Sequence, residues 1–223
     1  MLSKRDLESI RADLSRYDKV RERVFSLSRE AVRLAGSSIL EIHRGDSKGA
    51  SGTIHRAEEV LEEVRKLCGD FTEFSTSPGV VVAFQEFVEA TALSRFVEKG
   101  SIPSLTDLVV DWRAYMLGLL DVIGEFRRMA LNGLRKGDVG LAERTLVVME
   151  GVYEDLQGLD HTSIIPTFRV KMDAARRIIE ATRGDVVTEV RRLSLEVALD
   201  RLGRKIDGGR VRGRKPRTGK ERG

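Results

Sequence analysis

Apolar residues recur at intervals of three and four along most of the chain, and the strict alternation typical of a half-buried strand is nearly absent. One stretch with this spacing contains Val20, Val24, Leu27, Ala31 and Leu34. Such spacing places side chains on one face of an α-helix. With only 4 Pro and 5% aromatic residues among 223, little interrupts the pattern. It predicts an all-α protein.

Capping residues and glycines divide this pattern into six or seven helices. Ser77 followed by Pro78 has the order of an N-cap and a first helical residue. Ser104 and Asp107 have the spacing of a capping box, which predicts the start of a long fourth helix. The expected helices cover approximately residues 3–44, 52–68, 77–100, 104–137, 138–157, 165–182 and 185–202.

Charge is distributed unevenly along the chain. The net charge is +4, but residues 204–223 hold nine Lys or Arg against two acids, a local charge of +7, so residues 1–203 carry −3. The basic segment contains almost nothing to bury, and such a composition is typical of disorder. We therefore expect one helical domain over residues 1–203 and a disordered basic tail over residues 204–223. The tail either solubilises the chain or contacts phosphate backbones.

Several classes of protein do not fit the sequence. The single cysteine, Cys68, excludes an internal disulfide or a multi-cysteine zinc site. No run approaches the roughly 20 apolar residues of a membrane span, and the N-terminus is too charged for a signal peptide. The common nucleotide-binding and hydrolase motifs are also missing. We expect a cytoplasmic protein with no membrane partner.

The segment FQEFVEA, residues 84–90, places two acids on a largely apolar helix. Because a helix advances about 100° per residue, Glu86 and Glu89 lie about 60° apart. In the next long helix Asp121 and Glu125 lie about 40° apart. If the two helices pack as antiparallel neighbours, which their short connection favours, four carboxylates converge in one pocket.

Convergent carboxylates repel one another unless a cation lies between them. Ligation by oxygen alone suits Mg²⁺ or Mn²⁺, and such ions clamp a phosphodiester and activate water. The spacing leaves a second interpretation open, in which each acid is paired with an arginine such as Arg95, Arg127 or Arg128. A di-iron centre needs two Glu-x-x-His motifs, which the chain lacks. The histidines stand alone, which favours surface or capping positions: His43, His55 and His161.

Basic residues line the first predicted helix. Arg16, Lys19 and Arg23 lie within about 60° of one another, and Arg29 with Arg33 forms an i, i+4 pair. A nucleic-acid surface needs such a stripe, because phosphates are contacted mainly by Lys and Arg. Acids in the same helix leave a solvated face as the alternative. The scarcity of aromatic residues argues against a base-stacking platform.

Three motifs together resemble the translin superfamily, in particular its translin-associated factor X branch. FQEFVEA is similar to a Gln-Glu-Tyr-Val-Glu-Ala segment of that branch, and SREAVRLAGSSILEIHR to its first helix. Phe126 stands where the family has Leu, and Met116 where its pattern begins Tyr-Leu. The likeness covers roughly residues 10–200. Its central signature is matched by YMLGLLDVIGEFRRMALNGLRKGD at Tyr115, Gly118, Asp121, Gly124, Glu125, Arg128, Asn132, Gly137 and Asp138.

The resemblance implies an all-α fold of about seven helices and a hollow, octamer-like homo-oligomer. It also implies binding of single-stranded RNA, possibly single-stranded DNA, and Mg²⁺-dependent cleavage of RNA. The catalytic and metal-binding acids would be Glu86, Glu89, Asp121 and Glu125, with Glu125 the first choice for orienting the attacking water. By the same likeness the RNA surface would include Lys19, Arg21, Arg23, Arg29 and Arg33. The alternative is a non-catalytic nucleic-acid-binding shell in which the acids are structural.

Overall fold

The computed structural model describes residues 2–212, with side chains for residues 2–205. All of its regular elements in this range are helices, which confirms the predicted all-α class. Three short 3-10 helices cover Thr72–Thr76, Leu105–Asp107 and Thr162–Ile164. The α-helices are α1 (Lys4–Arg44), α2 (Ser47–Asp70), α3 (Pro78–Lys99), α4 (Trp112–Arg135), α5 (Val139–Gln157) and α6 (Phe168–Arg212).

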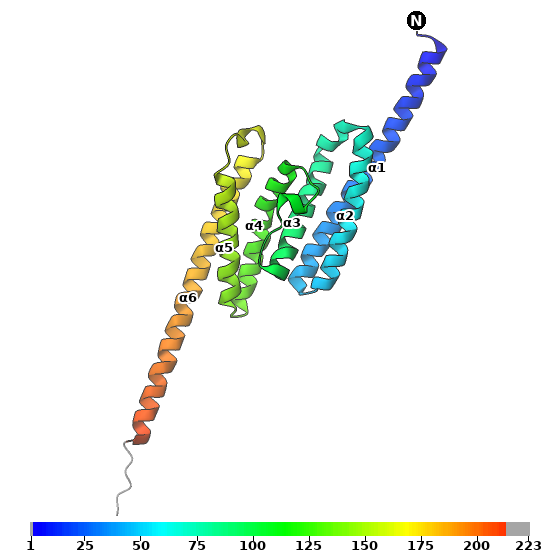
Figure 1. The fold of residues 1–223 in the computed structure, drawn as a ribbon. Coiled ribbons are helices and arrows are strands. Elements are labelled where there is room, and N and C mark those ends of the chain that lie inside the picture. Colours follow the sequence, from blue (N-terminus) through cyan, green and yellow to red (C-terminus); the bar gives the residue numbers. More distant parts are fainter. Residues whose placement is uncertain (1, 213–223) are drawn as a thin grey trace, which may run out of the picture.

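The helices lie side by side in an elongated bundle with α3 and α4 at its centre (Figure 1). α1 packs between α2 and α3, and α4 packs between α3 on one side and α5 and α6 on the other. α4 therefore buries about half of its residues, and its core residues include Leu119, Val122, Ile123 and Phe126. This central position explains why its acids face neighbouring helices rather than solvent. None of the helices within residues 2–212 combines the length and the apolarity needed to cross a membrane.

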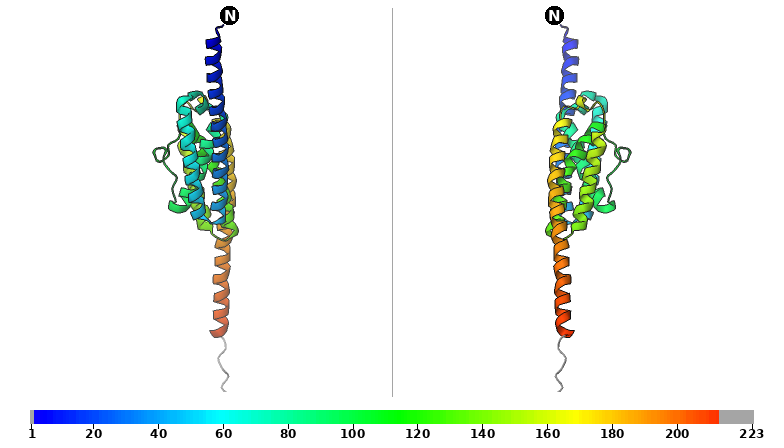
Figure 2. Two further views of the ribbon diagram at one scale, coloured as in Figure 1. Left: turned by 90° about the vertical axis from the view of Figure 1, so that its right-hand side faces the viewer. Right: turned by 90° about the vertical axis from the view of Figure 1, so that its left-hand side faces the viewer.

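Two helices project beyond the bundle at opposite ends (Figure 2). The first part of α1 carries exposed Leu7, Ile10 and Leu14, and the last part of α6 carries exposed Leu195 and Leu199. Exposed apolar side chains on unsupported helices indicate surfaces that other chains cover.

The C-terminal prediction differs from the structure in one respect. The helices expected over residues 165–182 and 185–202 are a single helix, because Gly184 lies inside α6 without ending it. A glycine lowers helix propensity by about 1 kcal/mol, which the packing of α6 on α4 and α5 outweighs. α6 also includes residues 204–212, which were predicted to belong to a disordered tail. The rest of that predicted tail, residues 213–223, lies outside the described residues.

Most other helix ends were predicted well. Gly45 and Gly100 end α1 and α3 with positive φ angles of 85° and 68°. α2 begins earlier than expected, because Asp46 caps it by accepting a hydrogen bond from the Gly49 backbone N–H. The capping box of Ser104 caps only a 3-10 turn.

The fourth helix starts later than predicted. After the 3-10 turn the chain becomes extended at Leu108, and Asp111 is the true N-cap of α4.

Candidate active site

A close approach between α3 and α4 brings the predicted acids together. A Cβ atom on Gly118 of α4 would lie 2.6 Å from the Gln85 carbonyl oxygen and 2.7 Å from Val88 Cβ. Only glycine fits at that distance. The contact lies one residue before Glu86 and three residues before Asp121, so the acidic segments of both helices face each other.

The four carboxylates form one electrostatically coupled cluster. Burial raises the pKa of Glu89 to about 8, and the negative charges of Glu86, Asp121 and Glu125 add to the rise. Burial likewise raises the pKa of Glu86, with further contributions from Asp121 and Glu125. Only groups near one another in a poorly solvated place have such effects. The acids of α3 and α4 therefore influence one another's ionisation, and their convergence around a common metal ion stays a prediction.

Asp121 and Glu125, the two acids of α4, already have hydrogen-bonding partners. Asp121 Oδ2 accepts a hydrogen bond of 2.5 Å from Gln85 Nε2, and Asp121 Oδ1 forms an ion pair with Lys171 of α6. Glu125 Oε2 lies 2.5 Å from Nε2 of the buried His43 side chain. That hydrogen bond is the main reason why the pKa of Glu125 is lowered.

The alternative interpretation requires each acid to be paired with an arginine, and few such pairs are present among the described residues. Arg128 lies 3.6 Å from Glu125, a long contact. Arg95 pairs instead with Asp107, and Arg127 bonds Thr182 and Asp185. Glu86 and Glu89 make no hydrogen bond or ion pair with any side chain of the described residues. Half of the cluster therefore lacks a partner.

The donor set suits a divalent cation, although the side chains are not yet arranged around one. Among the described residues, no three His, Cys, Asp or Glu side chains are grouped for metal binding. Asp121 is paired with Lys171, so a cation bound by Asp121 would have to displace an ammonium group. The four carboxylates, including the unpaired and mutually repelling Glu86 and Glu89, would supply oxygen ligands of the kind that Mg²⁺ or Mn²⁺ prefers once Asp121 separates from Lys171.

Three residues that contact the acids were not identified from the sequence: Gln85, Lys171 and His43. Gln85 directly precedes Glu86, and only the register of α3 against α4 shows that it reaches Asp121. Lys171 lies four residues before buried Ala175, and His43 lies four residues after buried Ile39. Lys171 and His43 could have been identified from the sequence as polar residues on an otherwise apolar face of a helix. His43 was expected at a surface or capping position; it lies in the last turn of α1, but it is not a surface residue, because its side chain is only 6% exposed.

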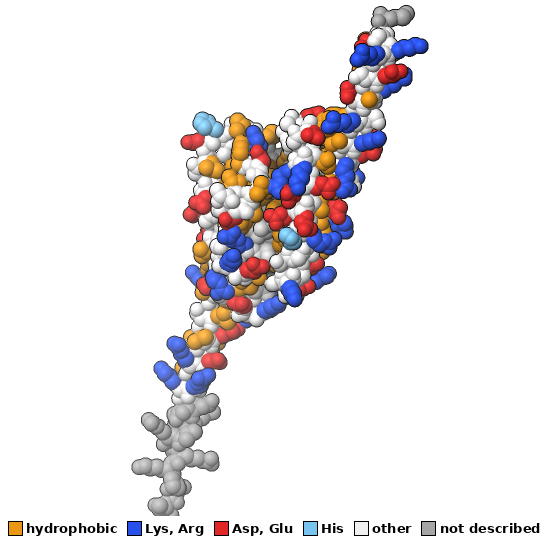
Figure 3. Space-filling view, turned by 45° about the vertical axis from the view of Figure 1, so that its right-hand side comes forward, with side chains coloured by type: hydrophobic (Ala, Val, Ile, Leu, Met, Phe, Trp, Pro, Cys, Tyr) orange, Lys and Arg blue, Asp and Glu red, His pale blue; other side chains and the backbone are white. Residues whose placement is uncertain are grey.

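The predicted RNA-contacting residues lie apart from the acids, on the exposed side of α1: Lys19, Arg21, Arg23, Arg29 and Arg33. Three of them are paired with acids, since Arg21 contacts Asp18, Arg23 contacts Glu63, and Arg33 contacts Glu30. Lysines and arginines alternate with acids over this face rather than forming a patch of one sign (Figure 3). Their role in RNA binding stays a prediction.

Without divalent cations, the protein is expected to lose stability as pH rises from about 5 to 8. Glu89 has its folded pKa raised from 4.5 to about 8, so in this range the folded chain holds a proton that the unfolded chain has lost. The free energy of unfolding then falls by at most about 1.4 kcal/mol per pH unit. Glu86 acts in the same direction, whereas the lowered pKa of Glu125 changes stability only at lower pH.

Thermal unfolding in EDTA at several pH values measures this effect. Glu89→Gln, which cannot ionise, should flatten the pH dependence. An equally steep loss of stability in that variant would show that Glu89 is not the group responsible.

Fold and site together define a class of protein: an all-α bundle with coupled carboxylates between its two central helices. Residues 19–181 match the Translin family, and the chain belongs to that family. An uncharacterized protein of Methanocaldococcus jannaschii is 34% identical over 195 residues, 85% of each chain. Translin-associated protein X of Mus musculus is 24% identical over 190 residues, which cover 66% of this chain and 64% of the mouse protein.

Solved structures agree with this assignment. A structure of AfC3PO in complex with duplex RNA superposes with a TM-score of 0.75 at 34% identity, covering 84% of this chain and 98% of that chain. The structure of apo-NeC3PO has a TM-score of 0.76 at 24% identity, over 85% of this chain and 98% of that one. The second likeness concerns the fold alone. The predicted resemblance to the translin superfamily is confirmed.

Proposed function

We propose that the chain is a metal-dependent endoribonuclease that binds and cleaves single-stranded RNA. The observation that carries the proposal is the cluster of Glu86, Glu89, Asp121 and Glu125. Two of its members, Glu86 and Glu89, are partly buried and have no hydrogen-bonding or ion-pair partner among the described residues. Such acids need a cation, and a ligand set made of oxygen atoms alone suits a divalent ion that can also contact phosphate.

Each residue of the cluster has a distinct part in this proposal. The four carboxylates hold Mg²⁺ or Mn²⁺, which when bound polarises a phosphodiester and supplies an activated water. Lys171, which is paired with Asp121, would release that carboxylate to the ion and would then be free to neutralise a phosphate oxygen. His43 fixes the orientation of Glu125, the carboxylate assigned to positioning the attacking water.

RNA is the proposed substrate because the 34% identical AfC3PO has been solved with duplex RNA. That relative holds a duplex, so a short duplex belongs in the test beside single-stranded RNA and DNA. The projecting ends of α1 and α6, with their exposed leucines, support assembly into a homo-oligomer such as an octamer. Sedimentation of the purified protein measures its size.

A second candidate, a nucleic-acid-binding shell without catalysis, has one observation in its favour. Asp121 and Glu125 are already paired with Lys171 and His43, as purely structural ion pairs would be. In that case Glu86 and Glu89 would simply remain protonated or partly solvated.

Cleavage of end-labelled single-stranded RNA by the purified protein separates the two candidates. We expect internal cuts with Mg²⁺ or Mn²⁺ and intact RNA with EDTA, because removing the ion leaves the acids repelling the phosphate. RNA that is bound yet stays intact with either metal would support the binding shell instead.

A further inference from the structure

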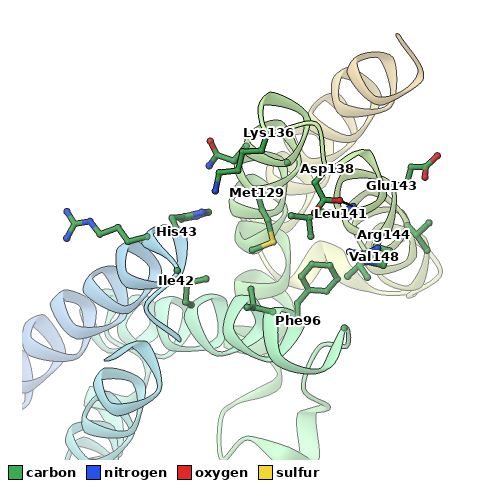
Figure 4. A pocket seen from close by; sticks show the side chains of 17 residues that line it. Ile42, His43, Phe96, Met129, Lys136, Asp138, Leu141, Glu143, Arg144 and Val148 are labelled. Atoms are coloured by element: carbon green, nitrogen blue, oxygen red, sulfur yellow. Dashed lines mark hydrogen bonds between the residues drawn. The ribbon is translucent and has the colours of Figure 1, made fainter. Parts of the chain in front are cut away.

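A cavity of about 790 Å³ opens beside the acidic cluster, at the end of the bundle where α1 and α3 finish and α5 begins. Figure 4 shows His43 of α1 and Leu141 of α5 on opposite sides of it, with Met129 of α4 between them. Its apolar lining also includes Ile42 and Phe96. A partly apolar hollow of this size matches the pockets that hold small organic ligands.

The cavity is continuous with the proposed active site through two features. His43 lines the cavity and also bonds Glu125. In addition, α4 presents Glu125, Met129, Asn132 and Lys136 on one face, at steps of four, three and four residues. At 1.5 Å per residue this face runs about 16 Å from the acid to the lysine. That length corresponds to roughly five nucleotides of a stacked strand.

The cavity lining carries an excess of positive charge, with Arg44, Lys136 and Arg144 against two acids. Lys136 and Arg144 line it, and neither makes an ion pair with an acid within residues 2–205. Two acids also belong to the lining. Asp138 is occupied in capping α5, where its Oδ1 accepts from the Leu141 N–H, and Glu143 is exposed. The signature residues Asn132 and Asp138 thus shape this cavity rather than the acidic cluster.

We propose that this cavity binds a nucleotide of the RNA chain that lies roughly five nucleotides along the strand from the cleavage site. Its phosphate is held by Lys136 and Arg144, and its base lies against Met129 and Phe96. The proposal rests on the proposed function, since it takes the ligand to be RNA. It adds a subsite, separate from the four acids, that positions the strand relative to them.

The test measures binding of a single-stranded oligonucleotide in EDTA to protein carrying Glu89→Gln, so that cleavage plays no part. In that background Lys136→Met with Arg144→Met should weaken binding. The slope of log K against log salt should become shallower by about 0.7, because the two side chains hold one phosphate and each lost phosphate contact removes about 0.7 for single strands. Arg135→Met with Arg176→Met removes two exposed arginines outside the cavity and should leave the slope unchanged.

Adenosine monophosphate, adenosine and inorganic phosphate serve as small probes. The monophosphate should bind the control protein and lose at least about tenfold in affinity in the Lys136/Arg144 variant, whereas adenosine should be affected little. If the Lys136/Arg144 variant still binds RNA with an unchanged salt dependence, the cavity is not a nucleotide subsite. The nuclease proposal is unaffected by that result. A changed oligomer mass with an unchanged slope also overturns the subsite, because the cavity is then a contact between subunits. Absence of any RNA binding would instead remove the proposed function.

Discussion

Glu89→Gln should abolish RNA cleavage while the protein still folds and binds RNA. Glutamine keeps the size of the side chain but cannot supply the anionic oxygen that a divalent cation requires. Loss of several kcal/mol of transition-state stabilisation corresponds to a fall of about 1,000-fold in the cleavage rate. Stability in EDTA should be unchanged or higher near pH 8, because the variant no longer carries an acid whose pKa burial and neighbouring acids raise.

Glu98→Gln is the matched control for this experiment. Glu98 lies on the same helix but is exposed, and its carboxylate makes a 3.3 Å contact with Ser94. The control should cleave RNA at the unaltered rate. Equal activity in the two variants would show that the cluster is structural, in agreement with the binding-shell alternative.

Gly118→Ala should be the most destabilising of the small substitutions in α4. The added Cβ would meet a backbone oxygen of α3 at 2.6 Å, which cannot rotate away as a side chain could. Forced overpacking of this kind costs up to about 3 kcal/mol. For a chain of this length the melting temperature should fall by roughly 6 to 12 °C. Separation of α3 from α4 should also reduce cleavage, since it draws the acid pairs apart.

Gly124→Ala provides the comparison, because a Cβ there meets no atom within 4 Å. Replacing a helical glycine in open space should stabilise the protein by about 0.5 to 1 kcal/mol. Thermal or denaturant unfolding of the two variants measures the difference. If Gly118→Ala were as stable as Gly124→Ala, the close approach of the two helices would not be needed to assemble the site.

The acidic cluster could be predicted because helical spacing alone places Glu86 with Glu89 and Asp121 with Glu125. The partners of these acids could not, since Lys171 is 50 residues from Asp121 and His43 is 82 residues from Glu125. Contacts at that separation depend on how helices pack, which the local pattern does not specify. The cavity could not be predicted for the same reason, because its lining comes from four helices.

Some helix ends could be predicted from the local sequence, and others could not. The stops at Gly45 and Gly100 depend on one residue with a positive φ angle, which the sequence displays directly. The start of α4 was misplaced because a capping box satisfies backbone groups equally well at a single 3-10 turn and at a long helix. The continuity of α6 through Gly184 depends on packing against α4 and α5.

The carboxylates of α3 and α4 are proposed to form a divalent-cation site. Anomalous diffraction from crystals soaked in Mn²⁺ tests this proposal most directly. We expect one or two anomalous difference peaks among Glu86, Glu89, Asp121 and Glu125, and we expect Lys171 to have moved away from Asp121. Crystals that show no peak there, and in which Lys171 still contacts Asp121 at a Mn²⁺ concentration that supports cleavage, would contradict the proposal.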